Sequence, residues 1–299
     1  MTHVTNHRPT GTLRATSAPG PLESPSVRSA EHELARSRPL GGEQWIPELK
    51  PDSGRYRLRF ARTYGDLEDA CRLRYEVFNL ELGEGLPGSD ETGLDQDEFD
   101  EQCQHLLVID SQTEQVVGTY RMQVAEAARA GNGFYSETEY DISTFPAEDL
   151  ANAVELGRAC VAKEHRSKSV LFMLWRGMLS YVRANNRQLF FGCSSLTSQD
   201  PALGRRAYRQ LLREGKVHPK IALRPKPEFR CDVDPHAEIA SDATADSTPI
   251  VFPTLFALYL RFGAKVIGAP AIDRTFGTID FLIIVDSAKL STTTLASIA

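Results

Sequence analysis

The chain has 299 residues, and its 34 lysines and arginines against 40 aspartates and glutamates give a formal net charge of −6. An acidic total of this kind is not typical of a dedicated nucleic-acid-binding protein. The longest apolar run, Val170 to Trp175, has six residues, whereas a bilayer span needs about 18, so a spanning helix is excluded. The N-terminus lacks the apolar segment of a secretory signal, and we expect a cytoplasmic protein.

Two stretches are expected to lie outside a packed core. Residues 1–54 hold seven of the 17 prolines and show no apolar periodicity, which predicts a disordered N-terminal extension. Residues 231–249 are acidic and equally without pattern, and we predict a flexible insert there. The rest, about 226 residues, suits one α/β domain over residues 55–290, followed by a tail at 291–299.

The first half of the domain is predicted to begin with a half-buried strand at 56–60, where apolar and basic residues alternate. A helix follows, with Asp66 as its expected N-cap. An acidic loop at 81–101 contains nine acids and several glycines. Two apolar strands at 105–110 and 115–124 are separated by a short polar turn and predict a hairpin.

The second half is predicted to contain three strands and three helices. In chain order they are a strand at 153–162, a helix at 170–184, a strand at 188–193, helices at 201–214 and 254–262, and a strand at 281–285. The helix at 170–184 is apolar around most of its circumference, so it should pack on a sheet. The alternation of strands and helices predicts an α/β fold with a mixed sheet and helices on its faces.

Several common chemistries find no support. His105, His165, His218 and His236 are scattered and have no partner three or four residues away that would place two ligands on one face, so no metal site is predicted. The segment around Cys193 lacks the G-x-S-x-G turn of a hydrolase, and no phosphate-binding glycine loop occurs. The five cysteines contain no C-x-x-C spacing and are interpreted as reduced packing residues.

Charged residues inside apolar segments are the strongest functional signal. They are Arg74, Arg121, Glu155 and Arg158. A buried charge is unfavourable without a partner, so these residues form a structural ion pair or belong to a site. Because residues three apart point to opposite faces of a strand, either Gly157 introduces a bulge or Glu155 and Arg158 serve different sides of the sheet.

The order of these motifs resembles a known family. Arg74-x-x-x-Phe78, Asp97-x-x-Asp100, Val117-Gly-Thr-Tyr-Arg121 and Glu155-Leu-Gly-Arg158 are similar to the motifs of acyl-homoserine-lactone synthases, which have the GNAT fold of N-acyltransferases. The resemblance is closer to the bacterial ornithine N-acyltransferases of the ornithine-lipid pathway. It covers roughly residues 56–290 and includes Gly133-Phe-Tyr-Ser136, Glu155 to Val161, Leu174 to Gly177, and Asp273 to Asp280.

The resemblance implies transfer of a long, 3-hydroxylated acyl chain from acyl carrier protein to the α-amine of L-ornithine, which gives lyso-ornithine lipid. No bound cofactor is implied, and acyl-CoA is a second candidate donor. Glu155 and Arg158 are the implied catalytic residues, with Glu155 as general base, directly or through water. The implied substrate-binding residues are Arg74, Phe78, Asp97, Asp100 and Arg121. The implied donor-binding residues are Val161, Arg166, Lys168 and Cys193.

Other interpretations stay open at this point. Asp97 and Asp100 could belong to a solvated acidic loop, Phe78 to the core, and Arg166 and Lys168 to the solvated surface. The acceptor could be another amino acid or a homoserine-lactone precursor, and a non-catalytic acyl-binding regulator is the alternative from a different class. The basic stretch 203–230 suits acidic acyl carrier protein, the inner face of an anionic membrane, or plain solvation.

Overall fold

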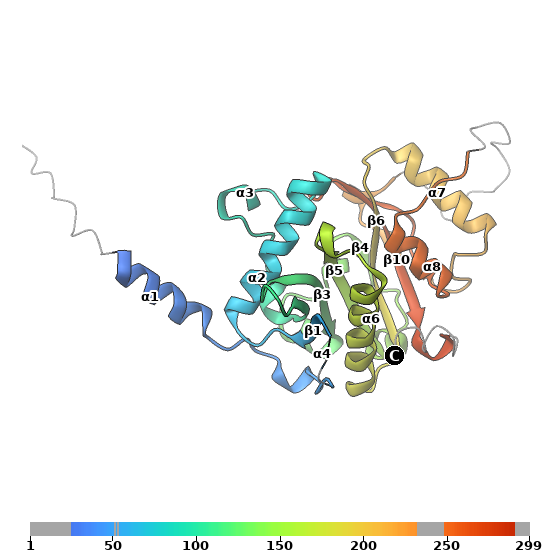
Figure 1. The fold of residues 1–299 in the computed structure, drawn as a ribbon. Helices are drawn as coiled ribbons and strands as arrows, with labels where there is room; N and C mark the ends of the chain where they lie inside the picture. Colours follow the sequence, from blue (N-terminus) through green and yellow to red (C-terminus); the bar gives the residue numbers. More distant parts are fainter. Residues whose placement is uncertain (1–24, 51, 53, 232–247, 291–299) are drawn as a thin grey trace, which may run out of the picture.

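A computed structural model describes residues 25–50, 52, 54–231 and 248–290 of the chain. Its centre is one mixed sheet in the order β1-β2-β3-β5-β6-β10-β8, with β9 paired to β10 (Figure 1). The strands are β1 Tyr56–Phe60, β2 Gln104–Asp110, β3 Val116–Val124, β5 Ala153–Val161, β6 Leu189–Leu196, β8 Lys265–Val266, β9 Ala271–Asp273 and β10 Thr278–Asp286. The mixed α/β sheet and the β2–β3 hairpin are confirmed.

Helices lie on both faces of this sheet. They are α1 Pro25–Arg36, α2 Tyr64–Tyr75, α3 Ser89–Thr92, α4 Ala125–Ala130, α5 Ala147–Ala151, α6 Lys168–Ala184, α7 Pro201–Arg213 and α8 Thr254–Arg261. A π-helical segment, Glu76–Leu82, continues α2, and β4 Tyr140–Asp141 pairs with β7 Arg224–Pro225 in a separate small ladder. Among the described residues, no helix is long and apolar enough to cross a membrane.

The first turn of α2 differs from expectation. Thr63 is the N-cap, and its hydroxyl accepts a hydrogen bond from the amide of Asp66. The carboxylate of Asp66 accepts the Thr63 amide in return, so the two residues form a capping box. The predicted cap at Asp66 was wrong by three residues because an acid at the third helical position and an acid at the cap look alike in sequence.

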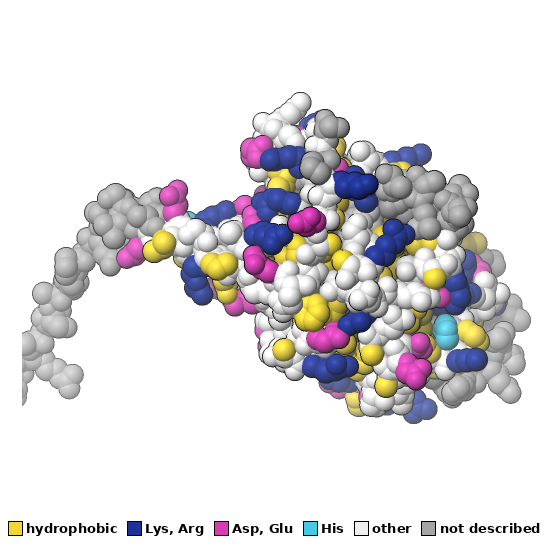
Figure 2. All heavy atoms as spheres, turned by 90° about the horizontal axis from the view of Figure 1, so that it is seen from below, with side chains coloured by type: hydrophobic (Ala, Val, Ile, Leu, Met, Phe, Trp, Pro, Cys, Tyr) yellow, Lys and Arg dark blue, Asp and Glu magenta, His cyan; other side chains and the backbone are white. Residues whose placement is uncertain are grey.

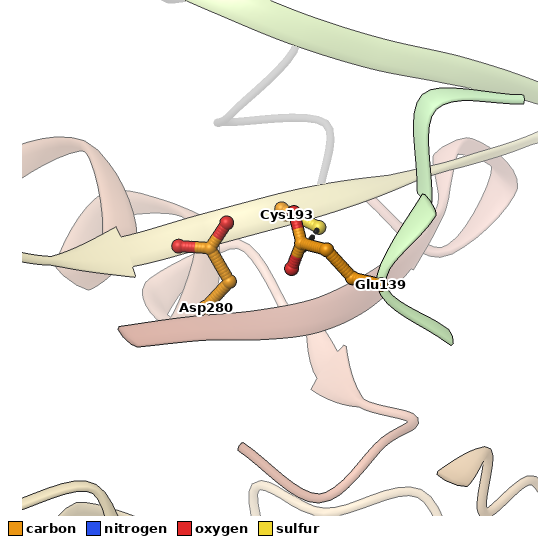
Figure 3. A group of neighbouring side chains, drawn as sticks. All are labelled: Glu139, Cys193 and Asp280. Atoms are coloured by element: carbon orange, nitrogen blue, oxygen red, sulfur yellow. Dashed lines mark hydrogen bonds between the residues drawn. The ribbon is translucent and has the colours of Figure 1, made fainter. Parts of the chain in front are cut away.

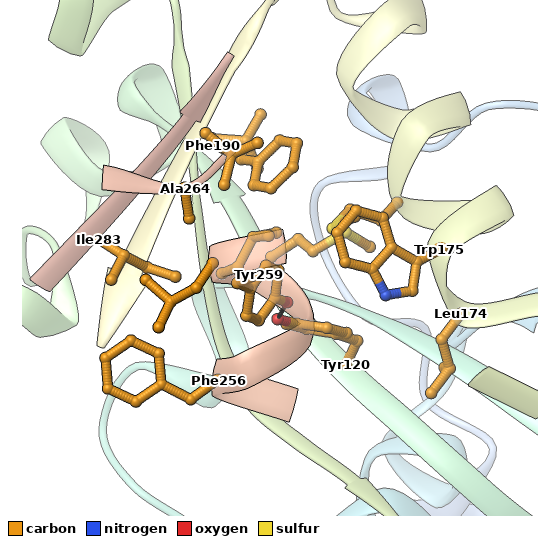
Figure 4. Packing of buried hydrophobic residues seen from close by; sticks show 14 of the residues in the cluster. Tyr120, Leu174, Trp175, Phe190, Phe256, Tyr259, Ala264 and Ile283 are labelled. Carbon is orange, nitrogen blue, oxygen red and sulfur yellow. Dashed lines mark hydrogen bonds between the residues drawn. The ribbon is translucent and has the colours of Figure 1, made fainter. Parts of the chain in front are cut away.

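The larger core lies between the sheet and helices α6, α7 and α8 (Figure 4). Trp175 of α6 is 1% exposed and packs edge-on against Phe190 of β6, with ring centroids 6.0 Å apart. Trp175 also stacks against Tyr259 of α8 at 5.2 Å. The apolar circumference of α6 is therefore explained by burial against both sheet and helix, at roughly 1.5–3 kcal/mol for each large side chain.

A smaller core covers the opposite face. Phe134, Phe145 and Phe191 meet there in edge-to-face contacts with centroids 5.2 and 5.4 Å apart. Tyr140 of β4 donates its hydroxyl hydrogen to the carbonyl oxygens of Ala269 and Asp280, each at 2.9 Å, and so holds β4 against β10 and the segment before β9. The polar part of the candidate active site lies on this face.

The termini of the domain depart from the expectation of disorder over 1–54. Residues 25–36 form α1, and Arg36 pairs with Glu68 and Asp69 of α2 at 2.7 and 2.8 Å. Leu40 is buried, and the carbonyl of Arg62 accepts its amide hydrogen at 2.9 Å. Residues 1–24, most of the predicted insert at 231–249, and the tail 291–299 lie outside the described residues.

Positive and negative side chains are mixed on one face of the molecule. Figure 2 shows Lys and Arg side chains interspersed with Asp and Glu over the coloured residues of the face seen there. Mixed signs of this kind cancel within roughly a Debye length of about 10 Å at 0.1 M salt.

Candidate active site

Strands β5 and β6 pair in parallel over only three residues, from Ala153 opposite Leu189 to Glu155 opposite Phe191. Beyond Glu155 the strands diverge, and residues of both line a cavity of about 240 Å³. A parallel pair that runs into the interior of a sheet normally keeps its ladder, so this divergence creates the site.

A β-bulge lies on β5 at the same level. Arg121 pairs with Gly157 and Thr119 with Cys160, so β5 has one residue more than β3 in this interval. Arg158 has φ +51°, in the left-handed region that a non-glycine residue adopts at a cost of about 1–2 kcal/mol. The sequence left open whether Gly157 makes a bulge; there is a bulge, and the left-handed residue is Arg158.

The cavity has an apolar end and a polar end on opposite faces of the sheet. The apolar lining comes from Tyr120, Leu156, Leu255, Phe256 and Tyr259, of which all but Leu255 belong to the larger core and Leu255 packs against it. The polar lining comes from Tyr135, Glu155, Arg158, Cys193, Ser195 and Asp280. A chain with an apolar tail and a polar head would therefore fit through the gap between β5 and β6.

Three arginines and three aspartates form a buried network beside the polar end. Arg74, fully buried, donates to both oxygens of Asp100 at 2.7 and 2.9 Å and through Nε to Asp95 at 2.9 Å. Such a two-pronged pair is among the stronger ion pairs in proteins. Asp95, which the sequence did not single out, is therefore as central as Asp100.

Arg121 and Arg158 complete this network. Arg121 donates to Asp100 at 2.9 Å and also binds Asp97, while Arg158 donates to the other oxygen of Asp97 at 3.0 Å. Both guanidinium groups lie over the ring of Tyr135, at 5.4 and 4.9 Å from its centre. Five of the predicted site residues thus meet in space, although they come from four separate segments.

Ion pairing determines the protonation of the network. Burial alone would raise the pKa of Asp100, but Arg74 and Arg121 outweigh it and hold that pKa well below the ordinary value. The pKa of Asp97 is likewise lowered by Arg121 and Arg158 despite burial. Both aspartates are ionised and already paired with arginines, so neither is free to bind a cationic amine.

Glu155 is held by four hydrogen bonds. One carboxylate oxygen accepts Gln123 Nε2 at 2.7 Å and the Tyr135 amide at 2.9 Å. The other accepts the amide and the hydroxyl of Ser136 at 2.8 and 2.5 Å. A carboxylate offers about four lone-pair positions, so all of them are occupied. The three residues that donate were not predicted; two of the donors are backbone amides, which no side-chain pattern reveals.

The predicted donor-binding residues are only partly gathered at the cavity. Of these, Cys193 lines it; Phe78, predicted to bind the substrate, also lines it, and its ring packs edge-on against Phe276 at 5.3 Å. Arg166 instead forms a two-pronged pair with Glu81 at 2.7 and 2.6 Å. Val161 ends β5, and Lys168 is exposed in the first turn of α6, both outside the cavity lining.

A second acidic group, missed by the sequence, lies at the polar end. Glu139 and Asp280 are 1% and 4% exposed, and their carboxylate oxygens lie within 4.8 Å of each other and of Cys193 Sγ. Asp280 interrupts the otherwise apolar strand β10, which is the same signal that singled out Glu155. Burial, followed by the charge of Glu139, raises the pKa of the Cys193 thiol well above 9.0, so Cys193 is not a thiolate nucleophile.

Comparison with known proteins agrees with this geometry. A model of the acetyltransferase (GNAT) domain matches residues 73–176. The chain is 33% identical over 247 residues to the L-ornithine N(alpha)-acyltransferase of Rhodobacter capsulatus, covering 79% of this chain and 92% of that protein. It is 32% identical over 249 residues to the enzyme of the same name from Brucella abortus, covering 80% and 86%.

Among solved structures, FeeM, an N-acyl amino acid synthase from uncultured soil microbes, matches with a TM-score of 0.43 and 12% identity over 81% of this chain and 97% of its own. The AHL synthase LasI matches with a TM-score of 0.42 and 12% identity over 81% and 94%. From the GNAT domain and the curated relatives, the chain is an acyltransferase with the GNAT fold and belongs to the family of the L-ornithine Nα-acyltransferases.

Proposed function

We propose that the protein transfers a long-chain acyl group, 3-hydroxylated as the resemblance implies, from a thioester on acyl carrier protein to the α-amine of L-ornithine, giving lyso-ornithine lipid. The observation that supports this most directly is the cavity that crosses the sheet between β5 and β6, apolar at the α8 end and charged at the other. The names of the curated relatives support the choice of ornithine.

The reaction needs a neutral amine next to the thioester. The base takes one proton from the ammonium and later releases it to solvent. The neutral nitrogen then attacks the carbonyl carbon, the C–N bond forms as the C–S bond breaks, and the second proton lost from nitrogen goes to the departing thiolate. We propose that Glu155 is this base, which typically contributes about 10²- to 10⁴-fold. Because its four lone-pair positions are filled, the entering amine must displace one donor, and the side chain of Gln123 is the one that can rotate away.

The substrate carboxylate is assigned to Arg158. Its guanidinium lines the cavity, and its buried Nε has no hydrogen-bond partner among the described residues. Asp97 and the rings of Tyr135 and Phe276 hold the group in place, with the Phe276 ring centre 4.5 Å away. Its Nε also lies 3.7 Å from Asp95 Oδ1, so acidic residues and aromatic rings hold the planar guanidinium in place before a substrate carboxylate arrives.

The donor is proposed to dock at the basic stretch 203–230. Its exposed basic residues are Arg213, Lys220, Arg224 and Arg230. Acyl carrier proteins are acidic, so opposite charges would steer the encounter. We expect the apparent KM for acyl carrier protein to rise with salt, since the Debye length falls from about 10 Å at 0.1 M to 3 Å at 1 M. A KM indifferent to salt contradicts this docking surface, and equal use of acyl-CoA contradicts the carrier requirement.

The acceptor is tested with purified protein and 3-hydroxyacyl carrier protein, offered separately L-ornithine, L-lysine, L-tyrosine, glycine and S-adenosylmethionine. We expect N-acyl product from ornithine in the largest yield, measured by mass spectrometry. If ornithine yields none while another amine does, the acceptor assignment is wrong.

The role of Glu155 is tested with Glu155→Gln beside the exposed control Glu148→Gln on α5. We expect kcat to fall about 10²- to 10⁴-fold in the first and to stay unchanged in the second. If Glu155 only positions the loop at 134–136, the acidic limb of the kcat/KM pH profile persists in Glu155→Gln. If Glu155 is the base, that limb disappears.

A further inference from the structure

Glu139 and Asp280 come from different parts of the chain and meet at the polar end of the cavity. Glu139 follows the turn at 135–138, Asp280 lies on β10, and Cys193 lies between them on β6 (Figure 3). Antiparallel pairing places Asp280 opposite Ser195 and Leu282 opposite Cys193, so these side chains share one face. Asp280 belongs to the cavity lining, and Glu139 lies directly behind it.

Neither carboxylate has a cationic partner within the described part of the chain. No arginine, lysine or histidine lies within 4.0 Å of either group, in contrast to the three aspartates of the arginine network. Oε1 of Glu139 and Oδ1 of Asp280 are buried and have no hydrogen-bond partner there. The Glu139 carboxyl contacts the weak donor Cys193 Sγ, 3.9 Å from Oε2, and shares a hydrogen bond with the neighbouring carboxyl of Asp280.

Two neighbouring buried carboxyl groups without a cationic partner, one of them in a cavity wall, are unfavourable in the ionised form in the free protein. Burial, then the charges of Asp280 and Asp273, raises the pKa of Glu139 well above 4.5. Burial also raises the pKa of Asp280. Such a group is stabilised by a cation that enters the cavity, because attraction in a poorly solvated site is stronger than in water.

The position of the group fits the second amine of a diamino acid. Cys193 is close enough to the charges of Glu139, Asp280 and Glu155 for all three to raise the pKa of its thiol. The two acidic elements, the proposed base and the unpaired pair, are therefore neighbours at one end of a single cavity. An ammonium donates three hydrogen bonds, and the unpartnered oxygens of Glu139 and Asp280 are acceptors for two of them.

We propose that Asp280 and Glu139 form the subsite that binds the side-chain ammonium of the acceptor amino acid. This inference rests on the proposed function and deepens it, because it names the residues that select a cationic side chain. Asp280 contacts the ammonium from the cavity wall, and Glu139 supplies the second negative charge from behind. The buried network of Asp95, Asp97 and Asp100 takes no part in this selection.

The test compares L-ornithine with L-norvaline, which has the same carbon skeleton and lacks the side-chain amine. Kinetics are measured for the wild type, Asp280→Asn and Glu139→Gln. We expect the KM for ornithine to rise about 10- to 100-fold in each variant, where tenfold corresponds to 1.4 kcal/mol, with kcat changed little. We expect kcat/KM for norvaline to stay constant or to rise, so that the preference for ornithine collapses.

The ratio of the two substrates is read from one preparation, so partial misfolding of a variant cancels. Asp141→Asn, which removes an exposed charge two residues from Glu139, is the matched control and should keep the wild-type preference. If the wild type acylates no ornithine, the proposed function has failed, and this inference fails with it. If the wild type acylates ornithine and both variants keep its preference over norvaline, this inference alone is overturned.

A divalent metal is the competing occupant, because Glu139, Cys193 and Asp280 could each offer it a ligand atom. Kinetics of the wild type are therefore repeated after EDTA treatment and with added Mg²⁺ or Zn²⁺. We expect the ornithine preference to survive EDTA. If EDTA abolishes the preference and the metal restores it, the group is a metal site and the ammonium assignment is wrong.

Discussion

The molecule contains two buried acidic groups close together, and they differ in one respect. Asp95, Asp97 and Asp100 each have an arginine partner, whereas Glu139 and Asp280 have none among the described residues. The first group is complete as it stands and gives the site its shape. The second is incomplete until a cation arrives. Acidic residues in a sequence therefore do not identify a cation-binding site. A buried carboxylate without a cationic partner in the folded protein does.

The energetics of the two groups have opposite signs. Carboxylates whose pKa is lowered by arginines favour folding once ionised, and carboxylates whose pKa is raised by burial oppose folding once ionised. Four experiments test whether ionisation favours folding in the first group and opposes it in the second, from the largest expected effect to the smallest.

Arg74→Met should destabilise the protein most. The change leaves Asp95 and Asp100 buried without their main partner, and losing one member of a buried ion pair typically costs about 3–5 kcal/mol. The free energy of unfolding in urea measures this. A loss below about 1 kcal/mol would show that the network is no more structural than the unpaired group.

The KM for ornithine should depend on pH, and that for norvaline should not. Falling pH protonates Glu139 and Asp280, removes the attraction for the ammonium, and raises the KM for ornithine. Both groups have raised pKa values, so the change begins above the ordinary 4.5 of a glutamic acid. The other ionisable groups that interact with one or both members of the pair are Glu84, Asp273, Tyr135, Tyr140, Arg158 and Cys193.

The ratio of KM values between the two substrates, followed from pH 5 to 8, isolates the pair, because ionisation of the α-amine, which both substrates carry, affects both alike. We expect the ratio to change about tenfold or more, the equivalent of 1.4 kcal/mol. A constant ratio contradicts an ionised subsite.

Glu139→Gln should stabilise the free protein at high pH. An acid with a raised pKa contributes stability below its unfolded pKa of about 4.5 and loses that contribution as pH rises through the folded pKa. The neutral amide avoids this loss. Urea unfolding at pH 8 should therefore show a gain on the order of 1 kcal/mol over wild type, and no gain near pH 4.5. A loss of stability at pH 8 would mean that Glu139 has a partner after all.

Arg166→Met should change stability least. Its pair with Glu81 has the same two-pronged geometry as Arg74 with Asp100, but the arginine side chain is 44% exposed. Exposed ion pairs contribute about 0–1 kcal/mol. The same urea measurement would show whether burial, rather than geometry, separates Arg166 from Arg74. A destabilisation as large as that of Arg74→Met would remove that distinction.

Much of the fold could be predicted from the sequence because its signals are local. The alternation at 56–60, the apolar circumference of 170–184 and the short turn between the hairpin strands each depend on neighbouring residues only. Residues 25–36 were missed because their helix lacks an apolar stripe long enough to stand out among polar residues. Helix propensity alone is a weak signal, and the proline-rich composition of residues 1–54 outweighed it.

The site was predictable only where its residues are charged and lie in apolar surroundings. Arg74, Arg121 and Arg158 stood out for that reason, and the structure does bring them together. Glu139 stands in a polar stretch and resembles any surface acid until β10 covers it. The pairing of Asp280 opposite Ser195 depends on the register between strands about 80 residues apart, which no local pattern encodes.

The three-residue pairing between β5 and β6 also has a mechanical consequence. On one side of it stands the half-sheet β1-β2-β3-β5 and on the other β6-β10-β8. In the described part of the sheet, the ladder that joins them runs from Ala153 to Glu155 on β5, preceded by hydrogen bonds from the amides of Gln188 and Leu189 to the carbonyl of Asn152. A ladder of three residue pairs resists twisting far less than a ladder along the full length of both strands. We expect the two half-sheets to rotate relative to each other. The angle between them then determines how wide an acyl chain fits into the gap. That angle is the first quantity to compare between free and acyl-bound forms.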